Sequence, residues 1–146
     1  MLAASGFVWF VSCSERILLF LCFARPMIDF KEVLRDVVES VPGTLAGIII
    51  GKDGIILEHV TSSTSGIDVE LMGAEYAAMM VEVHKLASIF HFDNLKDITI
   101  VLDMMTLIIH VISEEYYFIL ITPRGADIGK GRYRVRIGSL KLREMV

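Results

Sequence analysis

The chain has 146 residues, the size of one domain that can bury a core of its own. Its two cysteines, Cys13 and Cys22, exclude disulfides, thiolate zinc sites and cysteine nucleophiles from residue 27 onward. The net charge of −4 divides into +5 over residues 124–146 and −9 over the rest. Such polarity suits a polar protein partner, an anionic membrane or RNA, but a solvated basic face on the last element is the simpler explanation.

Residues 1–26 are predicted to be a leader outside the domain. Their two apolar runs are separated by Glu15 and Arg16, so neither is long enough for a bilayer span. No positive charge precedes the first run, which argues against a secretory signal. The pattern favours an over-extended start, with Met27 as the natural first residue, over a hydrophobic anchor.

A first helix is predicted directly after Asp29. Asp29 and Glu32 have the spacing of a capping box, and Ile28 and Val33 have that of a hydrophobic staple. Apolar residues then recur at helical spacing on one face, until Pro42 ends the pattern.

The stretch 41–60, VPGTLAGIIIGKDGIILEHV, has the ingredients of a phosphate-binding loop at the wrong spacing. No glycine stands five residues before its Gly-Lys pair, and Lys52 is followed by Asp53 instead of Ser or Thr. Two β-branched runs, 45–50 and 55–60, flank an Asp-Gly turn. The stretch therefore predicts a β-hairpin.

A long helix is predicted over 69–90, with Asp68 as its N-cap and a length of roughly 33 Å. Its apolar residues occupy more than one stripe, whereas a surface helix needs only one. Two apolar faces predict burial on two sides, one against a sheet and the other against a partner subunit.

Three strands are predicted over 97–103, 106–113 and 116–122, joined by connections that are short enough only for hairpins. The last segment, 128–146, is ambiguous. RYRVRIGSLKLR alternates as a strand does, whereas Asp127 as a cap and apolar residues seven apart favour a helix. The order of elements predicts an α+β domain of profilin-like type, with a five-stranded antiparallel sheet.

The sequence supplies no motif for catalysis, a metal or a cofactor. The histidines His59, His84, His91 and His110 lack the spacing of a metal pair. The serines of the loop 61–66 lack a nucleophile elbow. Asp97 and Asp103 could act as paired carboxylates, but acids that bracket a strand are common. We therefore expect a protein that is not an enzyme and has no cofactor.

Several motifs together resemble a bacterial or archaeal Roadblock domain. The motifs are Val41-Pro42-Gly43, Asp53-Gly54 and Ala74-Glu75-Tyr76-Ala77-Ala78, followed by GADIGKGRYRVR near the end. This family includes the dynein light-chain Roadblock and the MglB-type regulator of a gliding-motility GTPase. The resemblance covers about 28–146 and implies a single Roadblock-like domain over 27–146, with the order α-β-β-α-β-β-β-α and a final helix.

The resemblance also implies a homodimer, in which the long helix and the adjacent central strand meet their symmetry mates. The interface residues that it implies on the helix and the strand are Glu75, Met79, Glu82, Val83, Leu86, Thr99 and Val101.

The partner that the resemblance implies is a small Ras-like GTPase in the cytoplasm. The candidate contacts are Met72, Tyr76, Arg124 and Arg132. Either arginine could be nominated as an arginine finger, but the regulators resembled here reposition the GTPase's own residues, so no catalytic residue is expected. No nucleic acid is expected.

Two alternatives to a GTPase regulator stay open. One is a membrane-associated adaptor dimer, which uses the leader or the basic tail. The other is a profilin-like small-molecule sensing module, which needs a cavity at the sheet.

Overall fold

The computed structural model describes residues 29–63, 65–92 and 94–146. The leader, the staple residue Ile28 and both cysteines lie outside the described residues, as does Met27. In chain order the elements are α2 (Phe30–Ser40), β1 (Ala46–Gly51), β2 (Ile56–Thr61), α3 (Val69–Ile89), β3 (Asp97–Val101), β4 (Met105–Val111), β5 (Tyr116–Pro123) and α4 (Ile128–Arg143). This is the predicted order, and the ambiguous last segment is a helix.

An aspartate begins each helix. Asp68 accepts a hydrogen bond from the backbone N–H of Leu71 at 3.1 Å, and Asp127 accepts one from Lys130 at 2.9 Å. At α2 the Asp29 carboxylate meets the N–H of Lys31 instead, at 3.2 Å. The reciprocal side-chain bond from Glu32 that completes a capping box is not among the hydrogen bonds of the described residues.

The five strands form one antiparallel sheet in the order β2-β1-β5-β4-β3. The central strands β1 and β5 are buried on both faces, which explains their continuous apolar sequences. In the sheet of one chain β3 is an edge strand, so the interface strand implied by the resemblance is not central within the monomer.

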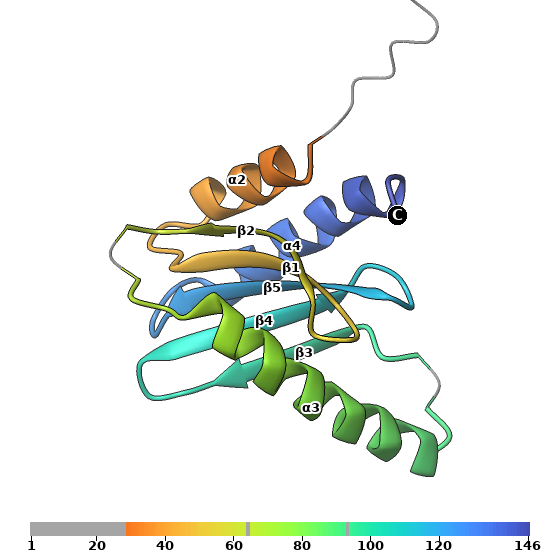
Figure 1. Ribbon diagram of the computed structural model, residues 1–146. Coiled ribbons are helices and arrows are strands. Elements are labelled where there is room, and N and C mark those ends of the chain that lie inside the picture. Colours follow the sequence, from red (N-terminus) through yellow and green to blue (C-terminus); the bar gives the residue numbers. More distant parts are fainter. Residues whose placement is uncertain (1–28, 64, 93) are drawn as a thin grey trace, which may run out of the picture.

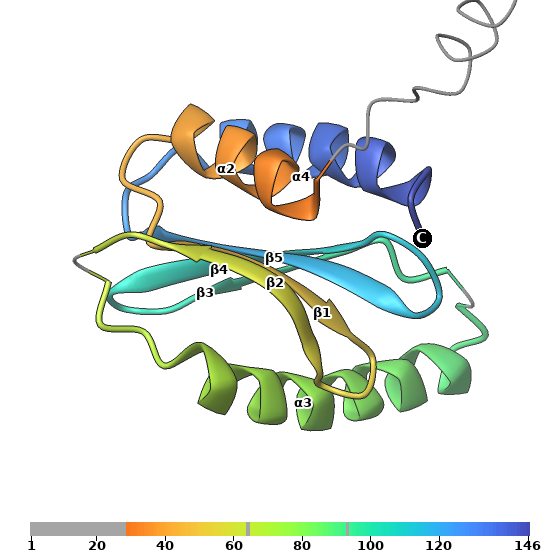
Figure 2. The same cartoon turned by 45° about the horizontal axis from the view of Figure 1, so that its top comes forward.

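Helices cover the two faces of the sheet unequally. Figure 2 shows α2 and α4 side by side on one face and α3 by itself on the other. Two apolar cores result. Leu34, Phe118 and Leu142 belong to the core under α2 and α4, whereas Ile50, Met80 and Ile119 belong to the core under α3.

The predicted Asp-Gly turn is present between β1 and β2 and supports α3. Asp53 accepts a hydrogen bond from the N–H of Ile55 at 3.0 Å, and Gly54 has a positive φ of 84°. A Cβ at position 73 of α3 would lie 2.9 Å from the carbonyl oxygen of Gly54. Glycine at 73 therefore allows the helix to rest directly on the turn.

Candidate protein-interaction site

The long helix α3 buries only a narrow stripe against the sheet. Its buried residues Val69, Gly73, Tyr76 and Met80 recur every three or four positions and end halfway along the helix. The apolar side chains outside this stripe remain open to solvent, with Leu71, Leu86 and Ile89 exposed by 61%, 56% and 70%. The helix, which lies alone below the sheet in Figure 1, thus retains the second apolar side that its sequence predicted.

One side of α3 faces a part of the sheet that the helix does not cover. A hollow of about 300 Å³ lies there, between Met72, Glu75 and Met79 of the helix and Leu107 and Ile119 of the sheet. Its other lining residues, Leu71 and Tyr76, also come from α3.

The predicted interface residues of α3 all lie along this side of the helix. Glu75 and Met79 line the hollow, and Glu82, Val83 and Leu86 continue from them at spacings of three and four residues. We call the residues 71, 72, 75, 79, 82, 83 and 86 the open flank of α3. The structure therefore brings the five predicted helical residues together on one surface.

The two predicted strand residues lie on the other face of the sheet. Thr99 and Val101 stand opposite Ile108 and Thr106 of β4, and Ile108 belongs to the core under α4. Their neighbours Ile98 and Ile100 pack toward α3 and are the strand residues that our sequence reasoning missed. Period-two alternation separates the two pairs, but it does not indicate which pair shares a face with α3.

Backbone groups give β3 a further surface. Within the described sheet, β3 pairs only with β4, so its outer edge has a row of amide and carbonyl groups without a strand partner. This edge and the open flank of α3 lie on the same side of the molecule, because both border β4.

The four predicted partner contacts do not form one surface. Met72 is half-buried on the open flank, whereas Tyr76 is 5% exposed and offers a partner almost no area. Arg124 follows β5 and donates to the carbonyl oxygen of Asp103 at 3.5 Å. Arg132 lies on α4, across the sheet from α3, 3.8 Å from the carboxylate of Asp97.

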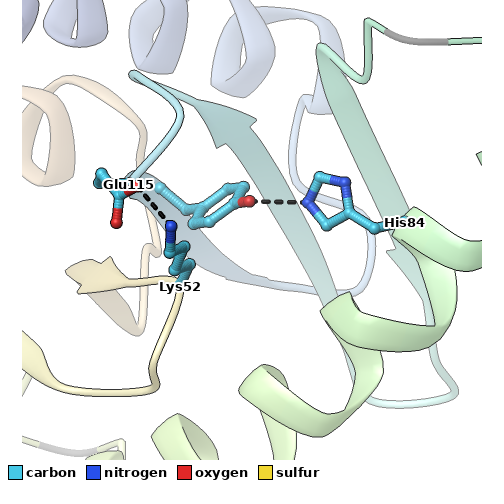
Figure 3. A network of polar contacts seen from close by, with 4 residues as sticks. Lys52, His84 and Glu115 are labelled. Carbon is cyan, nitrogen blue, oxygen red and sulfur yellow. Dashed lines mark hydrogen bonds and ion pairs between the residues drawn. The ribbon is translucent and has the colours of Figure 1, made fainter.

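Polar contacts fix α3 and the hairpin turns to the sheet (Figure 3). His84 of α3 meets the Tyr117 hydroxyl at 2.8 Å, and Lys52 of the β1–β2 turn pairs with Glu115 of the β4–β5 turn. The Tyr76 and Tyr117 rings pack edge to face, with 5.7 Å between their centroids. These contacts join α3 to β5 and the two hairpin turns to each other.

Burial changes the acidity of both tyrosines in this region. It raises the pKa of the Tyr76 hydroxyl far above 10 and raises the pKa of Tyr117 in the same direction. The Tyr76 hydroxyl is buried and has no hydrogen-bond partner among the described residues. Both side chains are therefore neutral at physiological pH.

The described residues include neither a metal-binding cluster nor a membrane-spanning helix. Among residues 29–63, 65–92 and 94–146, no group of three or more His, Cys, Asp or Glu side chains could hold a metal ion. No helix in these ranges is long and apolar enough to cross a bilayer.

Comparison with known proteins gives matches in structure. Neither a protein-family model nor a curated protein sequence matches the chain. Myxococcus xanthus MglB superposes with a TM-score of 0.74 and 13% identity, over 82% of this chain and 96% of that one. Myxococcus xanthus MglC superposes with a TM-score of 0.58 and 23% identity, over 78% of this chain and 96% of that one. A Roadblock/LC7 domain from Streptomyces avermitilis superposes with a TM-score of 0.66 and 16% identity, over 77% of this chain and 93% of that one.

Proposed function

We propose that this chain, which has the fold of Roadblock/LC7 domains, is a homodimeric regulator or scaffold of a small Ras-like GTPase in the cytoplasm. It acts without a catalytic residue of its own. The observation that carries the proposal is the open flank of α3, an apolar surface that a single chain leaves exposed beside a free strand edge. Apolar surface of this kind marks an interface with another protein.

A second copy of the chain is the simplest occupant of this surface. Two-fold contact would bury Leu86 and Met79 against their own symmetry mates, and the free edge of β3 could pair with another β3. The acidic residues Glu75 and Glu82 border the apolar ones and would form the polar rim of such an interface. A solved MglB structure of the same fold has a tetrameric arrangement, which supports self-association.

The proposal of a GTPase partner is supported by the Roadblock motifs of the sequence and by the shared fold with MglB and MglC. The described residues offer no catalytic cluster near the open flank, so an effect on hydrolysis would come from repositioning groups of the GTPase. Met72, Arg124 and Arg132 stay predictions as contacts with the GTPase. Tyr76, which is 5% exposed and lines the hollow, also stays a prediction.

The dimer is tested by light scattering on the purified chain. We expect a mass of twice the 16.3 kDa of one chain. Leu86→Glu places a charge on the open flank and should yield the monomer. Val81→Glu is the matched control, because Val81 is similarly exposed at 52% but lies on the other side of α3. A monomeric wild type, or equal effects of the two substitutions, would contradict the homodimer.

The GTPase partner is tested separately, with a Ras-like GTPase from the same organism. Wild-type chain and Leu86→Glu are each immobilised and exposed to the GTPase loaded with GDP or with a GTP analogue, and GTP hydrolysis is measured in parallel. Retention of the GTPase in at least one nucleotide state supports the proposal. No retention in either state, together with unchanged hydrolysis, would remove the GTPase role and leave the dimer unaffected.

A further inference from the structure

A second and larger hollow lies on the α4 face of the sheet, away from the open flank. It has a volume of about 640 Å³ and is enclosed by the start of β3, the end of β4 and one side of α4. The residues that matter for its chemistry are Lys96, Asp97, His110, Arg136, Leu140 and Arg143. The volume falls within the range of small-molecule sites, roughly 300–1,000 Å³.

Two cations in the wall have no partner in the described part of the chain. The Lys96 ammonium and the Arg136 guanidinium make no hydrogen bond or ion pair with any residue in 29–63, 65–92 or 94–146. Arg143 donates only its Nε–H, to the carbonyl oxygen of Ile112 at 2.8 Å. The terminal N–H groups of its guanidinium remain free to bind a ligand.

The acidic groups near these cations are partly neutralised. Asp97 is paired with the Nδ1 of His110 and lies 3.8 Å from Arg132. Glu114 is the other carboxylate of the lining. Of the lining residues, Lys96, Arg136 and Arg143 face these two carboxylates, so the lining has a surplus of one positive charge without counting His110.

The basic tail of the sequence is therefore divided between two sides of α4. Lys141 lies on the side toward α2, 3.6 Å from Asp36, and Arg134 precedes it by seven residues on that same side. Arg132, Arg136 and Arg143 lie on the side toward β3 and β4, where the hollow is. Two of these arginines, Arg136 and Arg143, line the hollow.

We propose that this hollow binds a small organic phosphomonoester. Arg136 and Arg143 hold the phosphate oxygens with charge-assisted hydrogen bonds, and Lys96 adds a third cation. A phosphomonoester carries about −1.5 to −2 charges at pH 7 and three strong acceptor oxygens, so it can engage all three cations of the lining, whereas a carboxylate offers one charge and two oxygens. Leu140 and Leu95 form an apolar wall against the organic part of the ligand.

The test is a titration of the isotopically labelled full chain with phenyl phosphate, followed by the backbone amide signals in NMR. We expect saturable shifts concentrated in residues 94–97, 110–114 and 136–143. Phenyl phosphate should bind more tightly than inorganic phosphate, because of the apolar wall, and more tightly than benzoate, because of the second charge.

Arg136→Gln should weaken binding of phenyl phosphate by about tenfold or more, as expected for a lost charge-assisted hydrogen bond. Arg134→Gln is the matched control, because it removes the same charge from the other side of the same helix; it should change the affinity by less than about twofold, the size of a distant screened charge. Arg136 has no partner within the described residues, so its loss should leave the fold intact, as circular dichroism can verify.

Three results would overturn the proposal: no saturable shift with phenyl phosphate, equal losses in the two arginine variants, or shifts centred outside the hollow. Benzoate binding as tightly as phenyl phosphate would overturn the assignment of a dianion. Inorganic phosphate binding as tightly would overturn the organic part of the ligand. The proposal is independent of the GTPase role and of the open flank, so its failure would leave both in place.

Discussion

The two faces of the sheet carry helices that differ in apolar content and in surroundings, because α3 is much richer in apolar residues than α2 or α4. On one face α2 and α4 pack against each other and the sheet, and the inward residues of α4, such as Val135 and Leu142, are fully buried. On the other face α3 lies alone, and its residues from Val81 onward include none that is buried. One layer buries its apolar side within a single chain, whereas the other leaves apolar surface exposed. Stability and association should therefore be separable by mutation.

The largest difference is expected between two leucines. Leu142→Ala in α4 empties a site with 0% exposure and should lower the free energy of unfolding by about 2–5 kcal/mol. Leu86→Ala on the open flank should cost less than about 0.5 kcal/mol in the monomer, as for other exposed sites. Urea unfolding at several protein concentrations measures both. If both variants lose the same unfolding free energy in dilute, monomeric protein, the proposed difference between the two helical layers is contradicted.

A smaller effect is expected where α3 rests on the hairpin turn. Gly73→Ala directs a Cβ at the carbonyl oxygen of Gly54, an overpacking that costs about 1–3 kcal/mol and is offset by about 1 kcal/mol of helix propensity. The net loss should reach up to about 2 kcal/mol.

The control for this contact is Gly129→Ala in α4. There the new Cβ would meet only the Asp127 side chain, at 3.3 Å, and the helix should gain up to about 1 kcal/mol. If thermal unfolding gives Gly73→Ala and Gly129→Ala the same change in stability, the close approach of α3 to the turn does not constrain the fold.

The smallest effects are expected from the two tyrosines under α3. Tyr117→Phe removes the hydrogen bond to His84 and should cost about 0.5–1.5 kcal/mol. Tyr76→Phe removes a buried hydroxyl without a partner and should be neutral or should stabilise the fold by about 1 kcal/mol. Chemical denaturation at pH 7 measures both, and a greater loss for Tyr76→Phe would contradict the assignment of its hydroxyl as unpaired.

The same tyrosines make the stability of the fold depend on pH. Burial raises the pKa of each above 10 in the folded chain, so the unfolded chain loses these protons first as the pH rises through 10. Their contribution to stability is complete below pH 10 and falls progressively above it. Tyr76→Phe should make that fall less steep, as unfolding curves between pH 8 and 11 would reveal.

The elements could be predicted where local signals are strong. Asp68 and the Asp-Gly turn at 53–54 are each bonded to nearby backbone in the structure, so their chemistry is visible in short stretches of sequence. The last helix could not be assigned by periodicity. Its buried stripe includes Gly131, Gly138 and Ser139, small residues that allow close packing but are not apolar in a hydrophobic pattern.

The surfaces were harder to predict than the elements, because they depend on strand order. Sequence spacing placed Met79 and Leu86 on one side of α3, but it could not show that β3 is an edge strand or which of its side chains face the helix. The second hollow combines segments near residues 96, 110 and 136, which only the folded sheet and α4 bring together.

The free edge of β3 limits how two copies could align. The strand has five residues, so an antiparallel pairing with its own copy, centred on the strand, would place the two-fold axis at Thr99. Each threonine would then face its own counterpart, a cross-strand pair whose hydroxyls can hydrogen-bond. Asp97 would lie opposite Val101 instead of another aspartate, so this register would keep the like charges apart.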